Sequence, residues 1–149
     1  MSPSGGVDDA PMEIYQAIMS DGLTSRLHRS LVYEKQIAQS AVIRYHPSEI
    51  SGQCVLQVTA AEGHELAKVE AVADAEMARL LKEPPTDEEM TRVKNRIEAG
   101  HFRQLARIGG FGGRADQLNH FSVFSANPDL INTSLDRYMA VTREDVMRV

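Results

Sequence analysis

Hydrophobic positions with helical spacing begin shortly after the N-terminus. Pro11 suits the first position of a helix, and the apolar positions that follow it are Met12, Tyr15, Ile18 and Met19. Gly22 comes just after this run, where helices commonly end in the left-handed conformation. The pattern therefore predicts a first helix from about Pro11 to the "SDG" turn.

A second helix is predicted immediately beyond that turn. Thr24 or Ser25 can cap its start, and the pattern continues to about Lys35, with Leu27 and Leu31 as its buried ridge.

The pattern then changes to strict alternation. One run places Ala41, Ile43 and Tyr45 on one side, and the run 53–60 places Cys54, Leu56 and Val58 on one side. A short polar loop joins the runs, which predicts an antiparallel hairpin. Two strands by themselves are marginal, so we expect an incomplete sheet. Its exposed edge could then pair with a second copy of the chain.

Helical spacing returns after Gly63. The predicted stripe is Leu66, Val69, Ala73, Met77 and Leu80. Pro84 and Pro85 end this helix, and Thr86 with Glu89 has the spacing of a capping box for the next one. We therefore interpret the acidic run 87–89 as helix capping and not as a carboxylate pair for catalysis. The helix that Thr86 caps is expected to extend up to the break "GGFGG" at 109–113. Further helices are expected at 114–124, at 130–141 and after Thr142.

The element order predicts an α+β fold, in which an antiparallel or mixed sheet packs against several helices. The length of 149 residues fits one domain, so residues 1–10 are interpreted as a flexible lead-in and 11–149 as the domain. A net charge of −5 argues against nucleic acid as a partner, and no apolar run is long enough for a membrane span. The single cysteine, Cys54, allows no internal disulfide and is interpreted as a small buried apolar residue.

Motifs for metal binding or catalysis are not found. The five histidines form neither H-E-x-x-H nor H-x-x-E-H, and His101 on an apolar helix face is expected to be half-buried. The stretch "GGFGGR" lacks the ending of a phosphate loop and is interpreted as a break between helices. No cofactor, metal ligand or catalytic group is therefore predicted in this chain.

Arg26 and Tyr33 are the candidate binding residues. Seven positions apart on an α-helix, they are separated by only about 20° around the axis. A guanidinium fork and a phenol together suit the carbonyls of an extended peptide. On spacing alone, a solvated helix face with no binding role is the favoured interpretation. We expect both side chains to lie on one face of the helix, with their polar ends reaching solvent or a concave surface.

The stretch "DGLTSRLHRSLVYEKQIAQSA" resembles the noncatalytic half of the pitrilysin/insulinase-type zinc peptidases, the inverted-motif zincins that include mitochondrial processing peptidase. The resemblance continues through "PPTDEEMTRVKNRIEA" and "GGFGGRADQLNHFSVFSANPDL" to "RYMAVTREDVMRV". It implies a partial domain of the LuxS/processing-peptidase-like metallohydrolase fold. In that family a zinc-carrying half faces a zinc-free half, which supplies an Arg and a Tyr that hold substrate; Arg26 and Tyr33 match this pair.

The resemblance thus implies the substrate-positioning, zinc-free half of a zinc-dependent metalloendopeptidase, inactive by itself. Its implied partners are a zinc-carrying homologous half, in the same polypeptide or another subunit, and a peptide substrate. The alternatives are a non-proteolytic scaffold subunit, like the core subunits of respiratory complexes, and a stand-alone peptide-binding module. Because the sequence ends within an apparent helix, we expect it to be a piece of a longer polypeptide.

Overall fold

The computed structural model describes residues 6–48 and 52–149. Residues 1–5 of the predicted lead-in and part of the predicted hairpin loop lie outside these ranges. The chain divides into two compact units, one formed by the chain up to Met90 together with Thr142–Val149, the other by Thr91–Val141. Within the described residues, no helix combines the length and apolar character that crossing a membrane requires.

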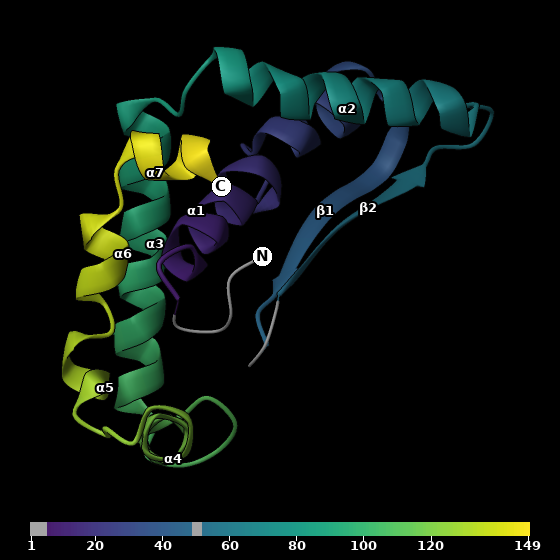
Figure 1. The fold of residues 1–149 in the computed structure, drawn as a ribbon. Coiled ribbons are helices and arrows are strands. Elements are labelled where there is room, and N and C mark those ends of the chain that lie inside the picture. Colours follow the sequence, from purple (N-terminus) through teal and green to yellow (C-terminus); the bar gives the residue numbers. More distant parts are fainter. Residues whose placement is uncertain (1–5, 49–51) are drawn as a thin grey trace. The chain divides into compact units, whose positions relative to one another are not determined.

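The first unit contains the strand pair that Figure 1 shows. It also contains the candidate binding residues Arg26 and Tyr33. Its complete elements are α1 (Asp9–Ser20), the π-helix η1 (His28–Glu34), β1 (Ala38–His46), β2 (Gln53–Ala60), α2 (Leu66–Lys82) and α7 (Arg143–Arg148). The helix α3 (Asp87–Ala106) begins in this unit and continues into the second one. Helices together with an antiparallel strand pair confirm the α+β fold class.

The predicted antiparallel hairpin is confirmed. Its register pairs Ala41 with Val58, Ile43 with Leu56, and Tyr45 with Cys54. The predicted inner face of β1 is buried, whereas the facing residues of β2 are only half-buried. The core of the first unit therefore lies mainly on β1, and β2 forms its margin.

The helices that cover this core follow the predicted stripes with two differences. The buried cluster comprises Met19, Leu27, Leu31, Ile37, Ala38, Ala41, Ile43, Val69, Ala73 and Leu80. Leu66 was predicted to belong to it but is exposed, because it is the first residue of α2 and precedes the part of the helix that packs. Glu76 takes a place in the buried stripe of α2 that the apolar pattern did not assign.

The second predicted helix differs most from expectation. Its backbone starts with an α-type bond from Arg29 N to Ser25 O, of 2.9 Å. It then widens, since Lys35 N donates to Ser30 O at 3.0 Å, five residues back, which makes η1 a π-helix. Gln36 follows with a positive φ of 53°, a conformation that bulky residues seldom adopt, and leads the chain into β1.

The second unit is helical. It holds the rest of α3 together with α4 (Arg114–Ser125), α5 (Leu130–Thr133) and α6 (Asp136–Ala140). The single helix predicted at 130–141 is wrong, because the chain divides there into two short helices. Lys94 Nζ stabilises the C-terminal end of α6 by donating to Met139 O and Val141 O, each at 2.7 Å.

The predicted helix break at 109–113 is confirmed. Gly110 and Gly112 have φ values of 81° and 72°, a region that glycine enters without steric cost. The predicted cap of the last helix is also confirmed, since Thr142 and Asp145 form a reciprocal capping box at the start of α7.

Candidate functional site

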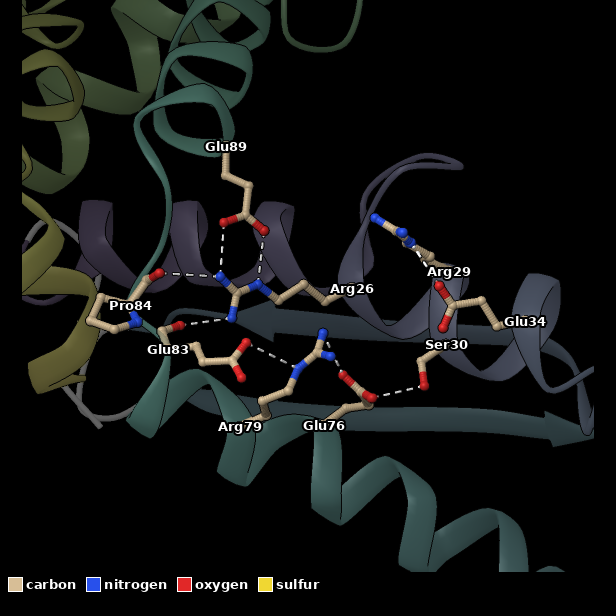
Figure 2. Close-up of polar contacts among 9 residues, drawn as sticks. All are labelled: Arg26, Arg29, Ser30, Glu34, Glu76, Arg79, Glu83, Pro84 and Glu89. Carbon is tan, nitrogen blue, oxygen red and sulfur yellow. Dashed lines mark hydrogen bonds and ion pairs between the residues drawn. The ribbon is translucent and has the colours of Figure 1, made fainter.

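Arg26 lies at the turn that leads into η1, and its buried guanidinium donates four hydrogen bonds (Figure 2). Nε and Nη2 donate to the two carboxylate oxygens of Glu89, both at 2.8 Å. Nη1 donates to the carbonyl of Glu83 at 2.9 Å, and Nη2 also donates to that of Pro84 at 3.3 Å. The prediction that its polar end reaches solvent or a concave surface is therefore wrong.

Glu89 has two structural roles at once. Its Oε2 accepts from Thr86 N at 2.8 Å, while Glu89 N donates to Thr86 Oγ1 at 3.1 Å, which completes the predicted capping box. The hydrogen bond from Arg26 is the largest cause that lowers the pKa of Glu89 to about 2, and the bonds from Thr86 act in the same direction. The carboxylate of Glu89 thus remains ionised and has a structural role. This agrees with the interpretation of the acidic run 87–89 as helix capping.

A second polar cluster joins η1 to α2. Ser30 Oγ donates to Glu76 Oε1 at 2.8 Å, and Arg79 Nη2 lies 3.0 Å from Glu76 Oε2. Arg79 Nε also lies 3.7 Å from a carboxylate oxygen of Glu83, whose carbonyl accepts from Arg26. Figure 2 shows that this cluster lies beside the Arg26 contacts. Polar bonds therefore hold the turn before η1 through Arg26 and the first turn of η1 through Ser30.

Sequence reasoning missed this second cluster. The available signal was a carboxylate at position 76 on the same helix stripe as Val69, Ala73 and Leu80. A buried carboxylate needs a partner, so that position could have been marked as a polar contact to another element. Its partner Ser30 could not have been named, because it is 46 residues away in the chain.

Tyr33 lies in a different environment from Arg26. Tyr33 is 76% exposed as a residue, whereas Arg26 is 8% exposed. The prediction that both residues share one helix face assumed α-helical geometry throughout, and the wider π-helical turns change their angular relation. Tyr33 is accompanied by an exposed ion pair between Arg29 Nε and Glu34 Oε1, at 2.8 Å.

Tyr45 and Cys54, which are paired across the sheet, also have shifted pKa values. Burial is the largest cause that raises the pKa of Tyr45 to about 12, followed by the charge of Asp9 and a hydrogen bond to it. Burial also raises the pKa of the half-buried Cys54 thiol, consistent with its interpretation as an apolar residue. Both shifts favour the neutral forms, so neither group is prepared as a base or nucleophile.

The described residues contain no group of three or more His, Cys, Asp or Glu side chains that could hold a metal ion. An open cavity of about 460 Å³ is lined by Pro84, Arg143, Glu144, Met147 and Arg148. Its two arginines are paired with Asp87 and Asp8, so their charges are already balanced within the first unit.

The family described as the peptidase M16 inactive domain matches residues 2–97. The search of curated proteins found no significant match.

Several solved structures share the fold. One is a Bordetella pertussis protein described as a candidate zinc protease, with a TM-score of 0.82 at 19% identity over 99% of this chain and 79% of that one. A protease from Helicobacter pylori gives a TM-score of 0.80 at 14% identity, over 99% of this chain and 35% of that one. A peptidase M16 inactive domain from Pseudomonas fluorescens gives 0.76 at 18% identity, over 98% of this chain and 34% of that one. The chain therefore spans most of the first structure and about a third of the other two.

Proposed function

Because this chain belongs to the peptidase M16 inactive-domain family, we propose that it is the substrate-positioning, zinc-free half of a zinc metalloendopeptidase. The single observation that carries this proposal is the family match over 2–97, which includes η1, the hairpin and the capping box. A homologous half that carries the zinc is the proposed partner, and an extended peptide is the proposed substrate.

The chemistry of peptide hydrolysis belongs to that partner half. A bound zinc ion would supply activation of water and polarisation of the carbonyl there. The described residues of this chain offer no ligand set for the metal, and its perturbed side chains are held in structural contacts. The contribution of this chain is then to bind and orient the peptide, a role that can account for a large part of a rate enhancement.

Tyr33 is the proposed contact between this chain and the peptide. Its phenol is exposed, while the start of the helix that carries it is held by the Arg26 and Ser30 contacts. A π-helical turn is frequently found at functional sites, and a held turn limits the entropy lost when an exposed ring binds. Arg26 supports Tyr33 by fixing the start of the helix. A direct contact of Arg26 with substrate would require it to leave Glu89 and stays a prediction.

The test uses the chain together with its zinc-carrying half and a peptide substrate. Tyr33→Phe should lower kcat/KM without changing the melting temperature. Arg29→Ala, in the neighbouring exposed ion pair, is the matched control and should leave both quantities unchanged. Unchanged kinetics in Tyr33→Phe would reject the proposed contact.

A non-proteolytic scaffold subunit is the second candidate function. It is favoured by the hydrogen bonds of Arg26, which go to residues of the same chain. In this arrangement Arg26 does not make the substrate contact that the resemblance implies. Sequencing the partner half separates the two functions. An H-x-x-E-H motif there supports the peptidase, and its absence supports the scaffold.

A further inference from the structure

The wide turn of η1 encloses Tyr33. Ser30 O accepts from Lys35 N at 3.0 Å, whereas in an α-helix it would accept from Glu34 N. Tyr33 lies between Ser30 and Lys35, inside the ring of backbone atoms that this hydrogen bond closes. The direction of the Tyr33 side chain therefore depends on whether this turn keeps its π-helical geometry.

The wide turn is an uncommon conformation that its surroundings must maintain. Gln36 follows it with a φ of 53°, and Ile37 N then donates to Leu31 O at 3.0 Å, six residues back. Turns wider than those of an α-helix are rare, and a left-handed residue other than glycine costs free energy. Such conformations persist where neighbouring contacts fix them, and they are frequent at functional sites.

Ser30 makes the contact that holds this turn against α2. Its carbonyl closes the wide turn, while its hydroxyl donates to Glu76 Oε1 at 2.8 Å (Figure 2). Ser30 and Glu76 are buried, whereas Tyr33 in the same turn is exposed. Because the two residues share one turn, a hydrogen bond that keeps Ser30 inward also directs Tyr33 outward.

The carboxylate of Glu76 is only partly compensated in its buried position. Oε1 accepts from Ser30, but Oε2 has no hydrogen-bond partner among the described residues. Arg79 Nη2 lies 3.0 Å from Oε2 without the alignment of a hydrogen bond, so this contact is electrostatic, and the Arg79 side chain is half-exposed. Burial of a carboxylate with one hydrogen bond is costly.

An apolar residue at position 76 would fit the rest of this helix stripe better. The other buried residues of α2 are Val69, Ala73 and Leu80. Replacement of buried ionic groups by apolar ones of similar volume is often neutral or stabilising, and buried polar groups can instead specify one geometry. The contribution of Glu76 is therefore better explained by the geometry of η1 than by stability.

Building on the contact proposed above between Tyr33 and the peptide, we propose that Glu76 and Ser30 are positioning residues for that contact. Their hydrogen bond maintains the wide turn of η1, and the wide turn directs Tyr33 toward the peptide. Neither residue touches the peptide itself. The helix α2, which carries Glu76, thus determines how the binding side chain is presented.

Amide hydrogen exchange in the 149-residue chain tests the turn directly. The variant Ser30→Ala/Glu76→Met replaces both partners of the hydrogen bond with apolar groups, so its urea midpoint should stay close to that of the parent chain. Its Lys35 amide should nevertheless exchange about tenfold faster, because the bond to Ser30 O opens more easily. Glu76→Gln keeps an acceptor oxygen and is the matched control, with exchange at Lys35 near the parent rate.

Two results of this experiment would overturn the proposal. An unchanged exchange rate of the Lys35 amide in Ser30→Ala/Glu76→Met would show that the hydrogen bond does not maintain the turn. A large fall in the urea midpoint of that variant would make the pair a contact for stability.

Kinetics with the zinc-carrying half and a peptide substrate test the link to binding. Ser30→Ala/Glu76→Met should lower kcat/KM by about two- to tenfold, as expected when one hydrogen bond to the peptide is weakened. In a chain that also carries Tyr33→Ala, the same two substitutions should cause no further loss, because residues that act through one contact are not additive. Equal losses in both backgrounds would overturn the positioning role and leave the Tyr33 contact in place. Parent kinetics in Tyr33→Ala alone would instead reject the contact itself, and the positioning role with it.

Discussion

Arg26 and Glu89, 63 residues apart in the chain, form a bidentate ion pair with two N–O distances of 2.8 Å. Their side chains are 9% and 19% exposed, so water screens this pair only weakly. The same carboxylate caps α3 through Thr86, while the same guanidinium holds the carbonyls of Glu83 and Pro84. The pair therefore fastens the connection between α2 and α3 to the start of η1.

Removal of the Arg26 guanidinium should destabilise the chain substantially. Arg26→Ala leaves the carboxylate of Glu89 without its charged partner, with Thr86 N as a remaining donor, and removes the guanidinium from the carbonyls of Glu83 and Pro84. We expect a loss of about 3 kcal/mol in the free energy of unfolding. Urea denaturation measures this quantity. The matched control is Arg29→Ala, whose ion pair with Glu34 is 71% and 48% exposed and should contribute less than about 1 kcal/mol. Equal losses in the two variants would contradict a structural role for Arg26.

The Arg26–Glu89 pair should also produce a defined dependence of stability on pH. The folded chain lowers the pKa of Glu89 from 4.5 to about 2, so the folded state binds this proton less readily than the unfolded state. The stabilisation is therefore fully present above about pH 4.5 and is lost as the pH falls toward 2. Denaturation of the parent chain and of Glu89→Gln across this window gives the comparison. The variant should show a shallower loss on acidification, and identical slopes would remove Glu89 as the cause.

The ring of Tyr33 should contribute to binding and little to folding. Because Tyr33 is 76% exposed, Tyr33→Phe should change the free energy of unfolding by no more than about 0.5 kcal/mol. With the zinc-carrying half present, loss of one hydrogen bond of about 0.5–1.5 kcal/mol should reduce kcat/KM by about two- to tenfold. A pronounced drop in melting temperature would instead make Tyr33 a structural residue.

The isolated chain should neither retain stoichiometric zinc nor cleave peptides. This expectation follows from the inactive-domain family and from the lack of a ligand cluster among the described residues. Elemental analysis of the purified chain and a peptidase assay with and without a chelator measure the two properties. Zinc at one ion per chain together with chelator-sensitive cleavage would contradict the proposed division of roles.

The sequence by itself determined those features that depend on neighbouring residues. Alternation predicted both strands and their pairing, Thr86 with Glu89 predicted a cap, and the glycines at 109–113 predicted a helix break. The resemblance of its motifs also indicated the peptidase family, which the match over 2–97 confirms. These signals are local because backbone conformation, capping and side-chain periodicity act over a few residues.

Only the tertiary structure decided how the candidate binding residues are used. A spacing of seven residues placed Arg26 and Tyr33 together on an ideal α-helix, but the chain widens into η1. Arg26 finds its acceptors at Glu83, Pro84 and Glu89, on a connection about sixty residues away, and Tyr33 turns outward. No local pattern contains that information, because burial of a guanidinium becomes favourable only where distant acceptors converge on it with good geometry.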